Sequence, residues 1–155
     1  MGVMFKIQAA RKERGFTLVE LAIVIVIIGV LASFGVPRFR DAVERSKAGE
    51  SMNYLSSVRA AQERFHAREG TYAADLADLD ISIPTPKYFS VGDVAAGSTD
   101  DLEDSWTLTL TRQGASAGYG VYTVTFTEQG YDPDKSSIND LPQINPIGTQ
   151  AASGS

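Results

Sequence analysis

Residues 14–37, RGFTLVELAIVIVIIGVLASFGVP, decide the fold of this chain. From residue 16 to residue 36 the only polar side chains are Thr17, Glu20 and Ser33. A helix of that length rises roughly 31 Å, about one bilayer hydrocarbon thickness. Its β-branched residues would also suit a buried strand, but strands seldom exceed about ten residues and lipid requires a self-satisfied backbone. The stretch therefore predicts a membrane-spanning helix.

Charges on either side of this helix orient it. Residues 1–15 carry four basic side chains and one acidic side chain, whereas residues 41–155 carry 8 basic and 17 acidic ones. By the positive-inside rule, the leader's net charge of +3 outweighs Arg38, Arg40 and Asp41 on the other flank, so the N-terminus is expected in the cytoplasm and the body of the chain outside it. The 155-residue chain has no cysteine, which excludes disulfides and thiolate metal sites. Its acidic body disfavours nucleic-acid binding through the whole surface.

Two other interpretations of the apolar stretch are open. In a cleaved signal peptide, the cleavage site would follow Val30–Ala32, but the apolar run is longer than a usual h-region. A plain single-span anchor for a soluble domain leaves Glu20 unexplained, because a carboxylate within a span is costly and usually marks a function.

Glycine and proline are expected to weaken the same helix. Pro37 removes one backbone donor and clashes with the carbonyl four residues earlier. Gly29 and Gly35 have low helix propensity. The sequence therefore predicts a weak point between Gly29 and Pro37.

Helical patterning continues beyond the membrane. Residues 38–69 contain no proline and are expected to be amphipathic. An apolar stripe at three- and four-residue steps is formed by Val43, Leu55, Val58, Ala61 and Phe65. Gly70 is the expected stop signal. One helix is predicted from Phe16 to Glu69, its second half packed on a head.

Residues 70–155 are predicted to form a small antiparallel β-sheet head. Its expected elements are a turn or short helix at 72–79 and strands at 88–91, 106–111 and 121–127. The small residues of 113–120 predict a hairpin loop. Three or four strands should place an apolar face on the helix and a threonine face in solvent. From Asp132 onward, a loop and then a flexible, frayed C-terminal tail are expected.

The head has no catalytic or cofactor-binding spacing, so neither an enzymatic activity nor a cofactor is predicted. His66 is interpreted as a packing or surface residue. The acidic run at 100–104 is interpreted as a solvated loop. Asp132, Asp134 and Asp140 could offer oxygen ligands to Ca²⁺, but their spacing is not that of an EF-hand loop and no metal is predicted.

Residues 14–37 resemble the class III signal and N-terminal helix of type IV pilins and their pseudopilin relatives. The resemblance implies a short leader that a prepilin peptidase removes between Gly15 and Phe16, followed by N-methylation of Phe16. Glu20 then stands at the fifth mature position. Gly29 and Pro37 fall where family members often carry glycine and proline. Beyond residue 37 the resemblance is one of architecture.

In this family, the carboxylate at the Glu20 position meets the N-terminal amine of a neighbouring subunit, here that of Phe16. The expected assembly residues are thus Phe16, Glu20, Gly29 and Pro37, the last two in a segment that can melt as subunits pack. Because burying two charges is costly, the pair is expected to add register more than net stability.

The resemblance implies a lollipop-shaped α+β subunit with four parts. These are a leader (1–15), a transmembrane and polymerisation helix (16–37), an amphipathic continuation (38–69) and the head with its tail (70–155). The expected function is a structural subunit of a type IV pilus filament serving adhesion, twitching motility or DNA uptake. The expected partners are other copies, the prepilin peptidase, an inner-membrane assembly platform with its ATPase, and the membrane before assembly. The chain would cross the inner membrane once and end in an extracellular filament.

The alternative is a pseudopilin of a type II secretion piston, or a minor pilin. The head lacks the cysteine pair of many pilins, which weakens the surface-pilin interpretation. It also lacks a Trp-Gly-x-Pro-Tyr-like stretch of major pseudopilins, because Trp106 stands in Ser-Trp-Thr, and this weakens the pseudopilin interpretation more. A DNA-binding minor pilin would need a basic tip, for which only Arg112 and Lys135 are candidates. No specific nucleic-acid partner is predicted.

Overall fold

The computed structural model of the chain describes residues 15–114 and 118–151. Most of the expected leader, residues 1–14, lies outside the described residues. The chain divides into two compact units, one that ends at Pro37 and one that begins at Arg38. We call the second the head unit; it holds the later part of the long helix together with all the strands.

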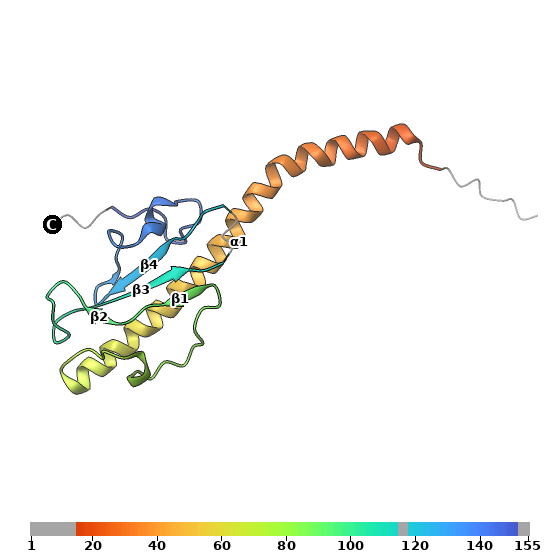
Figure 1. Cartoon of the computed structure of the whole chain (residues 1–155). Helices are drawn as coiled ribbons and strands as arrows, with labels where there is room; N and C mark the ends of the chain where they lie inside the picture. The colour runs from red at the N-terminus through yellow and green to blue at the C-terminus, as the bar shows by residue number, and fades with distance from the viewer. Residues whose placement is uncertain (1–14, 115–117, 152–155) are drawn as a thin grey trace, which may run out of the picture. The chain divides into compact units, whose positions relative to one another are not determined.

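One helix, α1 (Leu18–Glu69), runs for 52 residues (Figure 1). It ends where predicted, because Gly70 has a φ of 75° and its N–H donates to the His66 carbonyl at 2.8 Å. Its first residue lies two positions after the predicted Phe16. Pro37 lies inside the helix without a break. The predicted weak point therefore does not interrupt the helix in the single chain.

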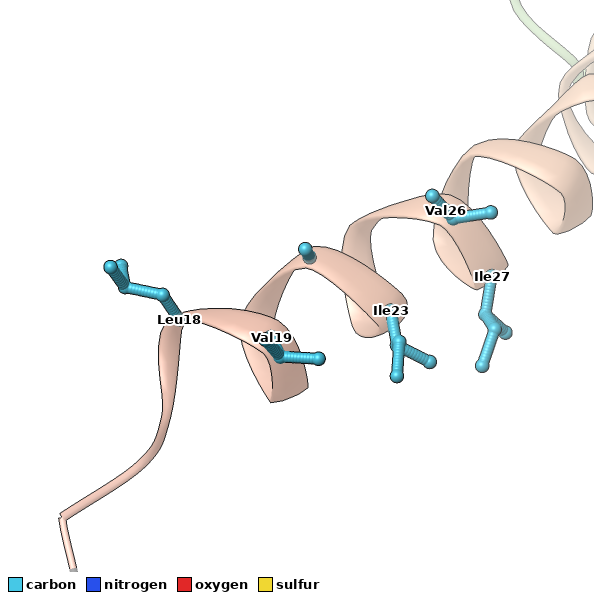
Figure 2. A pocket seen from close by; sticks show the side chains of 6 residues that line it. Leu18, Val19, Ile23, Val26 and Ile27 are labelled. Atoms are coloured by element: carbon cyan, nitrogen blue, oxygen red, sulfur yellow. The ribbon is translucent and has the colours of Figure 1, made fainter.

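The first unit exposes its apolar side chains. Every residue from Phe16 to Val36 is exposed to solvent. Figure 2 shows Leu18, Val19 and Ile23 projecting from the start of α1, around an open apolar hollow. Within the part of the chain that the structure describes, α1 is the one helix long and apolar enough to cross a membrane. The predicted apolar helix is confirmed, and its own chain leaves it uncovered.

The head unit adds a small antiparallel sheet to α1. Among the described residues its strands are β1 (Phe89–Val91), β2 (Ala95–Ala96), β3 (Trp106–Arg112), β4 (Thr123–Thr127) and β5 (Gly130–Tyr131). The order is β1-β3-β4-β5, with β2 also paired to β3. The expected three or four strands become five, because β2 and β5 are two-residue strands that show no alternation. The 3-10 turns η1 (Leu76–Asp78) and η2 (Ser137–Asp140) complete the unit.

The core lies between α1 and the apolar face of the sheet. Inward residues of β3 and β4 face each other as predicted, Leu108 opposite Phe126 and Leu110 opposite Val124. From α1 the buried apolar side chains are Ala48, Met52, Tyr54, Leu55, Val58 and Ala61. Val43 was expected to begin this stripe, but it is 39% exposed, and its neighbour Glu44 is buried instead.

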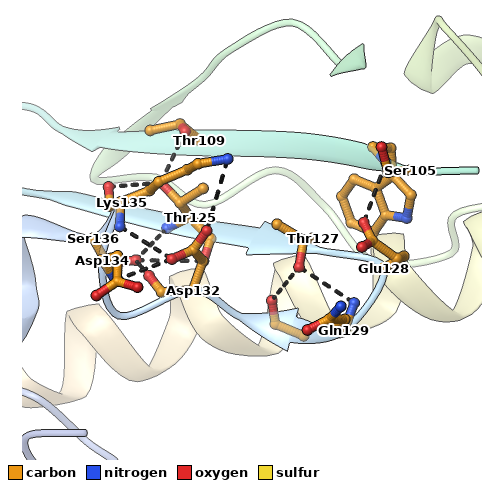
Figure 3. A network of polar contacts seen from close by, with 12 residues as sticks. Ser105, Thr109, Thr125, Thr127, Glu128, Gln129, Asp132, Asp134, Lys135 and Ser136 are labelled. Atoms are coloured by element: carbon orange, nitrogen blue, oxygen red, sulfur yellow. Dashed lines mark hydrogen bonds and ion pairs between the residues drawn. The ribbon is translucent and has the colours of Figure 1, made fainter. Parts of the chain in front are cut away.

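The threonine face of the sheet is only partly solvated, which corrects the prediction. Thr125 is buried under the chain that follows β5 (Figure 3). Its N–H donates to Ser136 Oγ at 2.9 Å, and its hydroxyl donates to the Lys135 carbonyl at 3.1 Å. On the same face Thr109 and Thr125 share a hydrogen bond at 2.9 Å between their hydroxyls. A C-terminal segment thus covers the middle of the sheet.

The same C-terminal segment contributes to the core. Ile138 and Ile144 have no exposed surface. Asn145 is equally buried, and its carbonyl accepts two hydrogen bonds from the Arg45 guanidinium at 2.9 and 3.2 Å. The expected frayed tail after Asp132 is therefore wrong up to Asn145, because this segment is part of the packed head unit.

Candidate assembly site

The two expected processing residues lie immediately before α1. Phe16 has 78% of its surface exposed. A Cβ placed on Gly15 would meet no atom of the described chain within 4 Å, apart from its neighbours in sequence. Packing within the described residues therefore does not explain why residue 15 is glycine.

Thr17 and Glu20 form a reciprocal cap on the first turn of α1. Glu20 Oε2 accepts hydrogen bonds from the Thr17 N–H and from the Thr17 hydroxyl, both at 2.8 Å. In return, the Glu20 N–H donates to Thr17 Oγ1 at 3.2 Å. This capping box satisfies backbone donors that a helix start leaves unpaired. Sequence reasoning missed it, although the T-x-x-E spacing at 17–20 signals it.

The remaining expected assembly residues lie further along the exposed helix. A Cβ on Gly29 would also meet no atom within 4 Å, so the chain's own packing does not require glycine there. Pro37 is the last residue of the first unit. The structure does not bring Gly29 or Pro37 to Phe16 and Glu20, and their part in assembly stays a prediction.

A second carboxylate of α1, Glu44, is buried in the head unit at the centre of an ionic cluster. Arg112 at the end of β3 donates from Nε to Glu44 Oε1 at 2.5 Å and from Nη2 to Oε2 at 3.2 Å. The Tyr122 hydroxyl donates to Oε1 at 3.0 Å, and Lys47 Nζ lies 3.1 Å from Oε2. The Glu44 and Arg112 side chains are each only 1% exposed. Bidentate pairing of this kind joins α1 to the sheet.

The charges of this cluster are fixed by their mutual contacts. Burial by itself raises the pKa of the Glu44 carboxyl. Hydrogen bonds from Arg112, Lys47 and Tyr122 outweigh burial and hold this pKa below its usual value. The hydrogen bond to Glu44 raises the pKa of Arg112, and burial followed by the Glu44 charge raises that of Tyr122. The pair is therefore ionised across the neutral range.

A further contact lies one turn before Glu44. The Tyr119 hydroxyl, in the β3–β4 loop, donates to the Asp41 carboxylate. This bond raises the pKa of Tyr119 to about 12. Sequence reasoning missed the Glu44–Arg112 and the Asp41–Tyr119 contacts. A charged residue on a helix normally indicates a solvated face, and both partners are far along the chain.

The residues considered for calcium are not gathered into a cluster of three carboxylates in the described part of the chain. Asp132 Oδ1 accepts from the N–H groups of Asp134 and Lys135 at 3.0 and 3.1 Å, and Oδ2 lies 3.9 Å from Lys135 Nζ (Figure 3). Asp140 lies in η2. Within residues 15–114 and 118–151, no group of three or more His, Asp or Glu side chains is arranged to hold a metal ion. The Asp132 carboxylate instead accepts hydrogen bonds from the backbone of the turn that follows it.

The candidates for a basic tip and for a reactive histidine have structural roles. Arg112 is buried against Glu44 and offers no surface to DNA, and Lys135 lies near Asp132. His66 stacks on Tyr72 with ring centroids 4.3 Å apart, and its Nε2 is 2.9 Å from the Glu103 carbonyl. The interpretation of His66 as a packing residue agrees with this geometry.

Comparison with known proteins agrees with the exposed helix. Residues 10–36 match the family model of the prokaryotic N-terminal methylation motif. The chain is also 32% identical to fimbrial protein EcpC of Eikenella corrodens over 125 residues, which cover 80% of this chain and 78% of that protein. The chain belongs to the type IV pilin family. The expected α+β pilin fold is thereby confirmed together with the family.

Other relatives match this pilin over a shorter part of its length. The type IV major pilin protein PilA of Myxococcus xanthus is 40% identical over 62 residues, which are 40% of this chain and 28% of the relative. The type IV major fimbrial protein FimA of Dichelobacter nodosus is 43% identical over 47 residues, 30% of this chain and 29% of the relative. The chain thus spans less than a third of these two pilins, whereas its match to EcpC includes most of the head unit.

Proposed function

We propose that this chain is a structural subunit of a type IV pilus filament that serves adhesion, twitching motility or DNA uptake. The observation that carries the proposal is the contrast in burial along α1. Every residue from Phe16 to Val36 is exposed, whereas the head unit closes around its own core. An apolar surface of this length is unfavourable in water and must be covered by lipid or by other copies.

We propose that the chain is processed between Gly15 and Phe16 by a prepilin peptidase and methylated on the Phe16 amine. The exposed position of Phe16 and the structurally unexplained Gly15 support this step, because an outside enzyme would select a glycine that the fold does not need. Residues 1–15 would be the leader, 16–37 the polymerisation helix, 38–69 its amphipathic continuation and 70–155 the remainder of the subunit.

Glu20 is the proposed acceptor for the amine of a neighbouring copy. Both of its hydrogen bonds to Thr17 use Oε2. Among the described residues no contact occupies Oε1, so a second partner can bind without displacing the cap. In an apolar filament interior the cationic amine would neutralise a carboxylate that is otherwise costly to bury.

Before assembly, the subunit would cross the inner membrane once, with its N-terminus in the cytoplasm. An assembly platform with its ATPase would then transfer it into an extracellular filament. The polymer itself would be built from copies of this chain. The role is structural, and the cluster around Glu44 serves the fold of the subunit.

An intact mass measured on filaments sheared from whole cells tests this proposal. We expect an abundant chain that begins at Phe16 and is one methyl group heavier than calculated. The same mass found only in membranes would favour a pseudopilin or minor pilin. A chain that begins near Ser33 or retains Met1 would contradict processing at Gly15.

The variant Glu20→Gln sharpens the test. We expect it to be processed normally and to keep a folded head unit, but to yield few sheared filaments. Glu50→Gln is the matched control, because Glu50 is exposed on the same helix outside the apolar stretch and glutamine can still accept the hydrogen bond from the Lys87 N–H. Normal piliation by Glu20→Gln would remove Glu20 from the assembly mechanism.

A further inference from the structure

We propose that the basic segment of one copy, which is Arg38, Phe39 and Arg40, docks on the acidic end of the head unit of a second copy. The acidic end is the end of the head unit where α1 terminates and where the loop before β3 lies. This contact would add an electrostatic, end-to-end interface to the apolar packing of α1. The inference rests on the proposed filament function, and it names a surface of the head unit that the apolar helix does not include.

The basic segment is an exposed helix surface that no described residue of its own chain covers. Arg38, Phe39 and Arg40 are all exposed, and Phe39 shows 69% of its surface. Among the described residues, neither arginine makes an ion pair or a hydrogen bond. The next residues differ, because Asp41 bonds to Tyr119 and Glu44 is buried against Arg112.

The far end of the head unit carries the opposite charge. The loop before β3 is held at the C-terminal end of α1, where the Tyr72 N–H donates to the Leu102 carbonyl at 2.8 Å. Nearby, His66 Nε2 lies 2.9 Å from the Glu103 carbonyl. The exposed carboxylates at this end are Glu63, Glu69, Asp75, Asp78, Asp80, Asp100, Asp101, Glu103 and Asp104. Its exposed arginines are Arg64 and Arg68.

These two surfaces cannot neutralise each other within one copy. From Arg40 to His66, α1 rises roughly 39 Å, several Debye lengths at physiological salt. Subunits that repeat by translation along a fibre present unlike ends to one another, which is the heterologous contact that builds open filaments. The basic segment of one copy can therefore meet the acidic end of the next.

Electrostatics favours a second copy over another partner. Residues 41–155 carry 17 acidic against 8 basic side chains, so neighbouring head units repel unless their acidic ends face positive charge. The basic segment supplies that charge at the opposite end of the same chain. Complementary charges of this kind fix the register of an interface and disfavour wrong arrangements. Anionic lipid headgroups are the competing occupant.

Reciprocal charge reversal tests the contact in cells. We expect Arg38→Glu with Arg40→Glu to lower the amount of sheared pilin roughly tenfold, and Glu103→Lys with Asp104→Lys to do the same, because like charges then oppose each other. The combined four-site variant should recover most of the filaments. Intact mass of the total pilin must show normal processing in every strain.

The matched control reverses two other exposed arginines of the same helix. Arg64→Glu with Arg68→Glu changes the net charge equally but makes the acidic end more acidic, so its attraction to the basic segment increases and filament yield should not fall. An equal loss in this control would mean that net charge alone matters, and would overturn the proposed contact. A loss in Arg38→Glu with Arg40→Glu that the lysine pair does not rescue would also overturn it, and would point to lipid headgroups.

Cysteine cross-linking supplies a direct readout, because the chain has no cysteine of its own. Oxidised filaments of the variant Arg40→Cys with Asp104→Cys should give a ladder of covalent oligomers, whereas each single variant should not. If wild-type cells yielded no sheared filaments, both the proposed function and this interface would be refuted. Filaments that tolerate every reversal and give no ladder would refute only this interface.

Discussion

Glu20 and Glu44 lie on the same helix, yet their surroundings have little in common. Glu20 is exposed among apolar side chains and is hydrogen-bonded to Thr17 in its own first turn. Glu44 is buried, and its partners Arg112 and Tyr122 come from the sheet. The fold of the head unit explains Glu44 completely, whereas Glu20 contacts only the first turn of its own helix. The difference separates a carboxylate that builds the subunit from one available to a neighbouring copy.

Removing the partner of Glu44 should have the largest effect. We expect Arg112→Ala to lower the free energy of unfolding by about 3–5 kcal/mol, because an uncompensated charge stays buried. Urea unfolding of the full chain in detergent micelles can be followed through Trp106, which is buried and the only tryptophan. Arg64→Ala is the exposed control. A loss below about 1 kcal/mol would mean that the cluster can reorganise around the missing partner.

Shortening a side chain of the C-terminal segment should cost nearly as much. Ile144→Ala is expected to lower the free energy of unfolding by about 2–5 kcal/mol, because it leaves a cavity in the core. Ile147→Ala, at a residue that is 47% exposed, should change it little. Equal effects of the two substitutions would show that the segment is not packed in solution as it is in the structure.

The ionised state of Glu44 makes stability depend on pH. The folded-state pKa of Glu44 is below its usual value, so its contribution is present above the unfolded-state pKa and is lost as pH falls through the folded pKa. We expect the free energy of unfolding to fall below about pH 4. Glu44→Gln should flatten this acid limb and be less stable at neutral pH. Glu63→Gln should leave the limb unchanged.

The cap at the start of α1 should have a smaller and local effect. Thr17→Ala is expected to destabilise the first turn by about 1 kcal/mol and to speed amide hydrogen exchange from Glu20 onward. The urea midpoint of the head unit should stay the same. Ser33→Ala is a suitable control, since the Ser33 hydroxyl donates to the Val30 carbonyl and caps no backbone N–H. A shifted midpoint would show that the two regions are coupled.

The smallest effect is expected at Tyr119. Its pKa is raised to about 12 by the hydrogen bond to Asp41, so its contribution is complete below the usual tyrosine pKa and disappears as pH rises towards the folded value. Tyr119→Phe should lower the free energy of unfolding by about 1 kcal/mol at neutral pH, and this difference should shrink above about pH 10. A constant difference at all pH values would exclude the Asp41 bond as its cause.

The sequence predicts those helices and strands that follow a repeating pattern of side chains or end at a local signal. The apolar run and the amphipathic stretch after it predict α1. Gly70 predicts its end, and alternation with threonine predicts the strands β3 and β4. The buried pair Glu44–Arg112 has no such signal, because its members are separated by 68 positions and each resembles a solvated charge. The C-terminal segment was missed because Ile138 and Ile144 are isolated apolar residues among prolines and asparagines.

Of the candidate site, the motif around Phe16 and Glu20 could be named from sequence, and the structure shows how exposed it is. The proposed pairing would join different copies, and for that reason a single chain cannot display it. The proposed contact of the basic segment also lies between copies. In a single copy its two arginines are ordinary exposed charges, and only a second copy would supply their partner.

The late position of Ile144 also sets the order in which the subunit can mature. Synthesis proceeds from the N-terminus, so the apolar half of α1 is made first and can enter a bilayer while most of the head unit does not yet exist. The head unit cannot close until Ile138 and Ile144 are available to its core. A subunit truncated before Ile138 would thus be able to insert but not to finish folding, so the segment that carries Ile138 and Ile144 would decide which copies reach the folded state.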